Sequence, residues 1–143
     1  MPLILLIALA TVFYTLYDAF ASKAGGTIDP NASSVIFNGL GAVIPLGIYL
    51  YIKLKGTGAQ PITKNGVIYS LLAGVAIALF SIIFIKIFEK GTLSYVIPLI
   101  YGGTVVLASL LGIFMFHDKV SVLQVLGLFV IAVGISIVVI AKA

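Results

Sequence analysis

Residues 122–141 read VLQVLGLFVIAVGISIVVIA and contain no charged side chain. A helix needs about 20 predominantly apolar residues to cross the hydrocarbon core of a membrane, so this stretch predicts a transmembrane helix. The backbone must be helical there, because lipid offers no partner for unpaired N–H and C=O groups. Four more stretches toward the N-terminus have the same apolar character. They are residues 3–21, 33–52, 66–88 and 93–116.

The five stretches predict an all-α membrane protein, a five-transmembrane-helix bundle that forms a single domain over residues 1–143. Residues 53–65 read KLKGTGAQPITKN, the longest polar segment, in which Gly and Pro favour a loop. The short connections 89–92 and 117–121 make the last three helices antiparallel neighbours. The N-terminal stretch also has features of a signal peptide, but no Lys or Arg precedes it. We therefore expect it to be a helix that is not cleaved.

Two connections carry signals for the start of a helix. Asp29 followed by Pro30 has the pattern of an N-cap residue and a proline at the first helical position. Ser121 and Gln124 have the spacing of a capping box, in which each side chain bonds the other residue's backbone N–H. We expect these residues to begin the second and the fifth helix.

The composition excludes several classes of protein. Hydrophobic residues make up 62% of the chain and charged residues 8%, whereas soluble domains carry about 25% charged residues. The eight lysines lie near the ends of the apolar stretches rather than in one patch, so they favour anchoring at the lipid surface over binding of nucleic acid. With no cysteine and a lone histidine, the chain predicts no metal site and no cofactor.

Polar residues recur at spacings of three and four in the first and fourth stretches, which places them on one face of each helix. They are Thr11, Tyr14, Thr15, Asp18 and Ser22 in the first stretch, and Ser94, Pro98, Tyr101 and Thr104 in the fourth. The two rows combine tyrosine, threonine and an ionisable group. This combination favours a solvated cavity that binds a substrate or an ion over a dry contact between helices.

Asp18 is the one acid of the first stretch. A carboxylate inside a membrane costs about 2.5–3.5 kcal/mol on insertion scales, so it is a candidate for proton or cation binding. Lys23 lies about a turn and a half further along the chain, which leaves a second interpretation open. In that case Asp18 reaches the interface and serves there as an anchor.

Asn38 lies in a row of small and polar residues in the second stretch, and we include it among the residues that bind substrate or ion. Rows of small residues elsewhere favour close packing of helices, above all Gly127 and Gly134 in the fifth stretch. No nucleophile motif and no phosphate-binding loop is present, and the lone His117 lies in a connection. The chain is therefore not expected to be an enzyme.

Residues 91–140 resemble the C-terminal end of a unit of the drug/metabolite transporter superfamily, in its EamA-type and small multidrug resistance branches. The shared features are a helix with Tyr101 and Gly102, a charged turn at His117-Asp118 and a helix with Gly127 and Gly134. The EamA pattern usually has Gly-Glu at the turn, and the aromatic cage of the smaller family includes a tryptophan, which this chain lacks.

The resemblance implies one EamA-type repeat, since full-length members carry two five-helix halves in inverted orientation. Small multidrug resistance proteins have four helices, assemble as antiparallel dimers and carry an essential carboxylate in the first helix. The resemblance implies a transporter that works by alternating access as a homodimer, and it makes Asp18 the candidate for coupling to protons. Gly127 and Gly134 then correspond to the dimerisation seam.

Two alternatives remain beside a small-molecule transporter. One is a flippase for a lipid-linked substrate, which needs a lateral opening toward lipid. The other is a non-transporting scaffold or subunit, in which the polar rows are dry contacts and Asp18 pairs with a lysine. Under each interpretation the lipid bilayer is a partner, and we expect the plasma membrane of a prokaryote.

The lysines divide evenly between the two sides of the membrane that five helices imply. Orientation normally follows an excess of Lys and Arg in short cytoplasmic loops. Lys53, Lys55, Lys64 and Lys119 fall on one side, and Lys23, Lys86, Lys90 and Lys142 on the other. This balance predicts dual topology, in which copies of the chain insert in both orientations.

Overall fold

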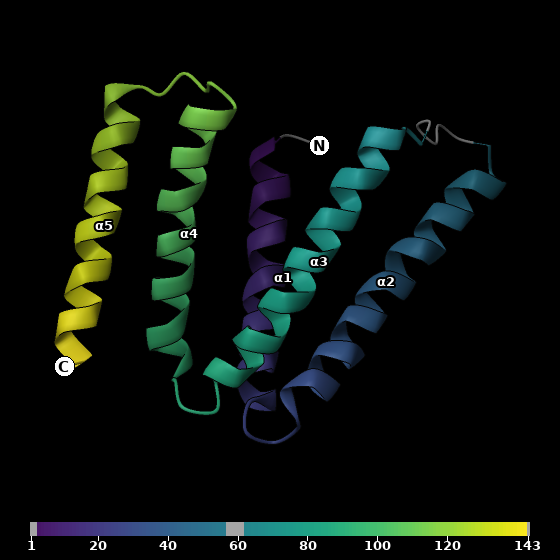
Figure 1. Ribbon diagram of the computed structural model, residues 1–143, viewed down its shortest axis with the longest axis horizontal. Helices are drawn as coiled ribbons and strands as arrows, with labels where there is room; N and C mark the ends of the chain where they lie inside the picture. Colours follow the sequence, from purple (N-terminus) through teal and green to yellow (C-terminus); the bar gives the residue numbers. More distant parts are fainter. Residues whose placement is uncertain (1–2, 57–61, 143) are drawn as a thin grey trace. The chain divides into compact units, whose positions relative to one another are not determined.

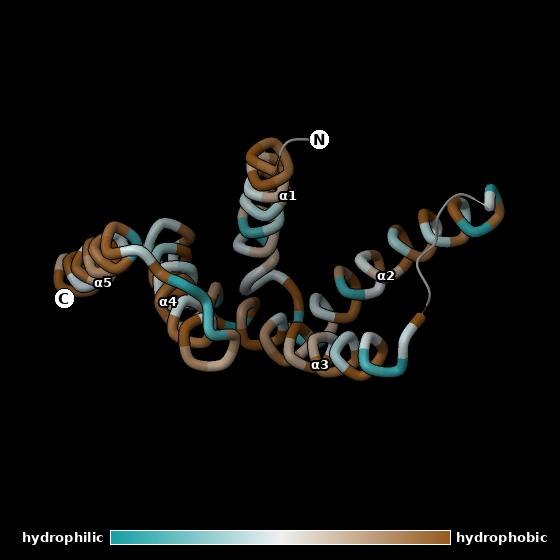
Figure 2. The backbone as a smooth tube through the Cα atoms, turned by 90° about the horizontal axis from the view of Figure 1, so that it is seen from above, coloured by the Kyte–Doolittle hydropathy of each residue, from teal (hydrophilic) through white to brown (hydrophobic). Residues whose placement is uncertain are grey.

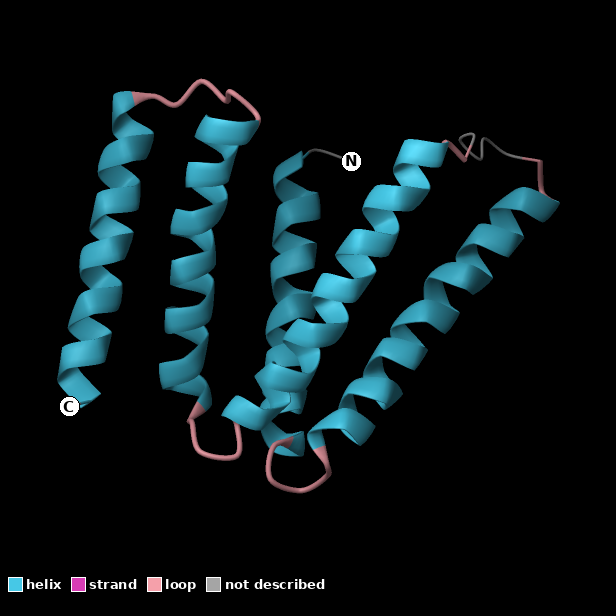
Figure 3. Cartoon of the chain, viewed as in Figure 1, coloured by secondary structure: helices cyan, strands magenta, loops and turns pink. Residues whose placement is uncertain are grey.

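The computed structural model describes residues 3–56 and 62–142. The described part is all-α, as predicted, and consists of five helices without strands (Figure 3). They are α1 (Leu3–Ala24), α2 (Pro30–Leu54), α3 (Lys64–Ile87), α4 (Leu93–Met115) and α5 (Val122–Lys142). Each is long and apolar enough to cross a membrane. The chain is a multi-pass membrane protein.

The predicted N-caps are present. Asp29 Oδ1 accepts hydrogen bonds from the backbone N–H groups of Asn31 and Ala32, at 2.9 and 3.0 Å, and Pro30 is the first residue of α2. In the capping box before α5, the Ser121 N–H donates to Gln124 Oε1 at 2.7 Å, and the Gln124 N–H donates to Ser121 Oγ at 3.2 Å. These bonds satisfy donors that the first turn of a helix leaves without partners.

Several helices are longer than expected from hydropathy alone. Helix α1 continues through Lys23 to Ala24 and is followed by Gly26, whose φ of +74° suits glycine. Helix α2 begins at Pro30, directly after its Asp29 cap, rather than at residue 33. The predicted loop 53–65 overlaps both helices that flank it, and its residues 57–61 lie outside the described part of the chain.

By its contacts the chain divides into two compact units. The first comprises Met1–Ala19 and Gly91–Ala143, and the second comprises Phe20–Lys90. In the first unit α4 and α5 run side by side as an antiparallel pair (Figure 1). Gly102 of α4 gives room to the side chain of Ile135 in α5, because a Cβ atom at Gly102 would overlap it.

The second unit is a hairpin of α2 and α3 joined to the end of α1. Its buried side chains gather where the start of α2 meets the end of α3, around Ser34, Ser81 and Phe84. Gly25 lies directly against Phe88, since a Cβ atom at Gly25 would lie 2.5 Å from the Phe88 Cβ. Nearer the connection between the two helices, their side chains are exposed.

The helices carry their apolar side chains outward, as a membrane protein requires. Figure 2 shows hydrophobic colour along most of α3 and α5, and hydrophilic colour on the connection between α4 and α5. Large apolar residues such as Leu72 on α3 and Phe129 on α5 are more than 60% exposed. In a bilayer these surfaces face lipid or other membrane helices.

Candidate functional site

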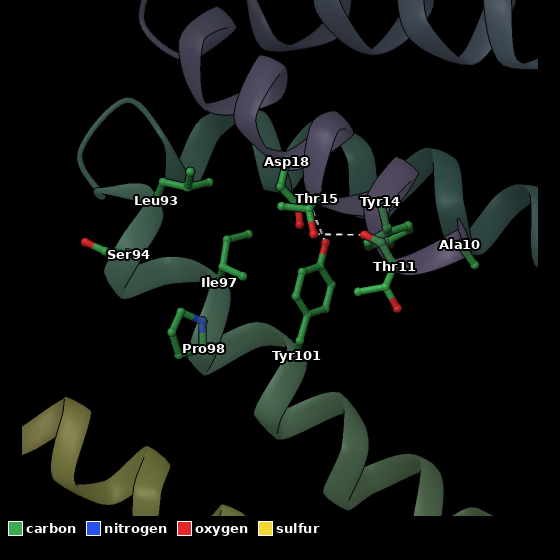
Figure 4. Close-up of a pocket in the computed structure, with 10 residues that line it drawn as sticks. All are labelled: Ala10, Thr11, Tyr14, Thr15, Asp18, Leu93, Ser94, Ile97, Pro98 and Tyr101. Atoms are coloured by element: carbon green, nitrogen blue, oxygen red, sulfur yellow. Dashed lines mark hydrogen bonds between the residues drawn. The ribbon is translucent and has the colours of Figure 1, made fainter. Parts of the chain in front are cut away.

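The first unit contains a cavity of about 800 Å³ between α1 and α4. Ten residues line it, five from each helix (Figure 4). They are Ala10, Thr11, Tyr14, Thr15 and Asp18 of α1, and Leu93, Ser94, Ile97, Pro98 and Tyr101 of α4. The polar members recur at helical spacing, so each helix turns one polar row toward the cavity.

Asp18 and Tyr101 meet across this cavity. The Tyr101 hydroxyl donates a hydrogen bond of 2.6 Å to Asp18 Oδ1. Asp18 is only 4% exposed, and its partner is a hydroxyl rather than an ammonium group. This arrangement differs from an interfacial anchor, which would reach toward water and pair with a lysine.

Tyr14 extends this contact. Its hydroxyl is hydrogen-bonded to the hydroxyl of Tyr101 (Figure 4), and the two rings meet edge to face with centroids 5.2 Å apart. Because Tyr101 gives its hydrogen to Asp18, Tyr14 is the donor in the bond between the tyrosines. The order of donation is therefore Tyr14 to Tyr101 to Asp18.

The threonines of α1 bond to their own helix. Thr11 Oγ1 donates to the carbonyl of Ile7 at 2.9 Å, and Thr15 Oγ1 donates to the carbonyl of Thr11 at 2.8 Å. Threonine commonly makes this i−4 bond in helices. The lone pairs of both hydroxyl oxygens remain available to a ligand in the cavity.

The structure brings together five of the seven residues predicted to bind substrate or ion: Thr11, Tyr14, Asp18, Ser94 and Tyr101. Ser94 lines the cavity, but its hydroxyl points away from Asp18 (Figure 4). Thr104, one turn beyond Tyr101, is exposed and does not line it; its hydroxyl donates to the carbonyl of Ile100 at 2.8 Å.

Asn38 lies in the second unit, in a network of hydrogen bonds between α2 and α3. The hydroxyls of Ser34 and Ser81 are bonded to each other, and the Asn38 carboxamide donates to Ser81 Oγ at 2.9 Å and to the Ser34 carbonyl at 2.8 Å. Ser81 in turn donates to the Ala78 carbonyl at 2.7 Å. This geometry gives Asn38 a role in joining two helices.

Gly127 and Gly134 do not take part in the packing of α4 on α5. No other atom lies within 4 Å of a Cβ placed at either residue. The less exposed residues of α5 are Leu128, Ala132, Ile135 and Val138, on another face of the helix. Within the described part of one chain, the face with the two glycines is therefore open.

Sequence reasoning did not find the apolar wall of the cavity. Ala10, Leu93 and Ile97 carry no feature that distinguishes them from other apolar residues of the helices. It also missed the bond between Ser34 and Ser81, since the pairing of α2 with α3 at this level is a tertiary property. Among the described residues, no group of three or more His, Cys, Asp or Glu side chains could hold a metal ion.

Comparison with known proteins does not assign the chain to a family. No family model matches the chain, and no curated protein and no solved structure matches it. The cavity therefore has to be interpreted from its own residues.

Proposed function

We propose that this protein is a membrane transporter for small molecules, of the drug/metabolite type, and that the cavity between α1 and α4 binds its substrate. The observation that carries this proposal is Asp18, a buried carboxylate in a cavity that has no lysine and no histidine among its ten lining residues. Within a membrane-spanning helix such a group is costly and commonly marks the path of a substrate or an ion.

The cost of burying the Asp18 carboxylate favours a site that binds a proton and a cationic ligand in turn. A buried carboxylate without a positive partner is destabilised by several kcal/mol or more unless it takes up a proton or binds a cation. The single bond from Tyr101 offsets part of this cost. Asp18 therefore holds a proton in one step of the cycle and a cationic ligand in another, which couples the two.

The geometry argues against a purely structural role. A scaffold would use the polar rows of α1 and α4 as dry contacts and would pair Asp18 with a lysine. The rows line a cavity of about 800 Å³, and Asp18 is held by a tyrosine. Tyr14 remains 45% exposed, so the cavity is open to its surroundings.

We also propose that two copies form the working unit, as an antiparallel homodimer in the plasma membrane of a prokaryote. Alternating access is commonly built from two inverted repeats around a site near the midplane, and the described residues form one set of five helices. The open glycine face of α5 and the even division of the lysines support this arrangement. We assign no enzymatic activity to the protein.

Flux through proteoliposomes tests the transport function. Reconstituted protein is given a panel of organic cations, amino acids and neutral metabolites, with and without a pH gradient, beside protein-free liposomes. Transport predicts saturable flux of at least one cation that responds to the gradient. A folded protein that moves none of them faster than empty liposomes contradicts it.

A further inference from the structure

The cavity offers a ligand more hydrogen-bond acceptors than donors. The hydroxyl hydrogens of Thr11 and Thr15 go to carbonyls of α1, and that of Tyr101 goes to Asp18. The Tyr14 hydroxyl is engaged with Tyr101, and the Ser94 hydroxyl points away from Asp18. Near Asp18 these groups therefore offer a ligand the carboxylate and oxygen lone pairs.

Pro98 adds a further acceptor. Proline has no N–H, so it cannot donate to the carbonyl of Ser94, which is four residues earlier in α4. Ser94 and Pro98 both line the cavity. The Ser94 carbonyl therefore lacks its usual helical donor.

The acceptors extend along the cavity rather than around one point. Thr11 and Asp18 are about two turns apart on α1, which corresponds to about 10 Å along the axis. Ile97 and Leu93 supply apolar wall on the opposite helix. The shape thus suits an elongated ligand with a polar, charged end at Asp18 and an aliphatic body.

We propose that the substrate is an aliphatic amine carrying a positive charge and N–H donors, a primary or secondary ammonium. This inference rests on the proposed function and names its substrate class. An ammonium with N–H groups neutralises Asp18 and can also donate to the Thr15 oxygen, one turn away on the same face of α1. An anion would meet the carboxylate, and no hydroxyl beside Asp18 has a hydrogen left to give it, since that of Tyr101 goes to Asp18 and that of Thr15 to the Thr11 carbonyl.

A quaternary ammonium is expected to bind poorly. It carries the same charge but has no N–H, so it would desolvate the acceptors without giving them a partner, and buried polar groups left in this way are costly. Proteins that bind such cations surround them with aromatic faces. Here Tyr14 and Tyr101 pack edge to face on each other, and the chain has no tryptophan.

A matched pair of probes tests the proposal by isothermal titration calorimetry, with the full chain in lipid nanodiscs. Hexylammonium and hexyltrimethylammonium share charge and alkyl chain and differ in the N–H groups. We expect hexylammonium to bind at least about tenfold more tightly. Asp18→Asn should abolish its binding, whereas Asp118→Asn, in the connection after α4, should not. Equal or tighter binding of hexyltrimethylammonium would overturn the proposal, as would the absence of hexylammonium binding to folded protein.

A second variant keeps the test informative if Asp18→Asn fails to fold. Thr15→Val preserves the shape of the side chain and removes one acceptor, so it should weaken hexylammonium binding several-fold and leave hexyltrimethylammonium unchanged. An equal effect on both probes contradicts the proposal. Binding does not require alternating access. Selective binding without flux would therefore refute only the proposed transport, and flux without selectivity would refute only the substrate class.

Discussion

Tyr101 donates a 2.6 Å hydrogen bond to Asp18 although 83 positions of chain separate the two residues. The bond joins α4 to α1 inside the first unit and orients the one carboxylate of the cavity. Hydrogen bonds to charged groups are among the stronger ones in proteins. Stability and ligand binding should therefore depend on the same pair.

A double-mutant cycle measures this bond. Asp18→Asn, Tyr101→Phe and the double variant are compared by reversible unfolding in mixed micelles. We expect a coupling energy of about 1.5–3 kcal/mol, the range for a bond to a charged group. Tyr69→Phe serves as a control, since Tyr69 is 70% exposed and its change should be silent. Additive effects of the two substitutions would show that the pair is not coupled.

Ser81 is predicted to stabilise the α2–α3 hairpin. It is fully buried and bonded to Ser34, Asn38 and the Ala78 carbonyl. Ser81→Ala should lower the free energy of unfolding by about 1 kcal/mol, as for other hydrogen bonds between membrane helices. The exposed Ser70 of the same helix is the matched control. Equal stability of the two alanine variants would argue against the network.

Gly25 is predicted to tolerate no side chain. A Cβ atom there would lie 2.5 Å from the Cβ and 2.9 Å from the backbone carbon of Phe88, and backbone cannot move aside cheaply. Gly25→Ala should destabilise the protein by about 1–3 kcal/mol, the usual cost of overpacking. Gly39→Ala is the control, because nothing lies within 4 Å of a Cβ at Gly39. An unchanged melting temperature for Gly25→Ala would contradict the observed contact.

Dual topology can be read from single cysteines, since the chain has none of its own. Ile62→Cys places a thiol before the start of α3, and Ala141→Cys places one at the end of α5. With five membrane crossings the two positions lie on opposite sides of the membrane. A reagent that does not cross membranes labels only the thiols that face the outside of intact cells. Insertion in both orientations predicts partial labelling at each position. If each position is labelled in one compartment only, the homodimer cannot be antiparallel.

Much of the fold was predictable, because lipid imposes a length and a conformation on each apolar stretch. The five helices follow from hydropathy, and the starts of α2 and α5 follow from the side chains of Asp29, Ser121 and Gln124. Helical spacing likewise placed Thr11, Tyr14 and Asp18 on one face. These are local properties of the chain.

The pairing of helices was not predictable in the same way. Nothing local indicates that the polar row of α1 faces α4, or that Ser34 bonds Ser81 across 47 positions of chain. Asn38 and Tyr101 look alike as polar residues within apolar stretches, yet one joins two helices and the other holds the carboxylate of a cavity. Such differences depend on which helix supplies the neighbour.

Gradient-driven uptake into proteoliposomes tests the role of Asp18 most directly. A cation found in the flux panel is supplied to wild type, Asp18→Asn and Asp118→Asn, each verified as folded by circular dichroism. We expect Asp18→Asn to lose the gradient-driven component, because its amide can neither release a proton nor neutralise a cation, and Asp118→Asn to retain it. Uptake by Asp18→Asn at the wild-type rate and with the same response to the gradient would contradict the account.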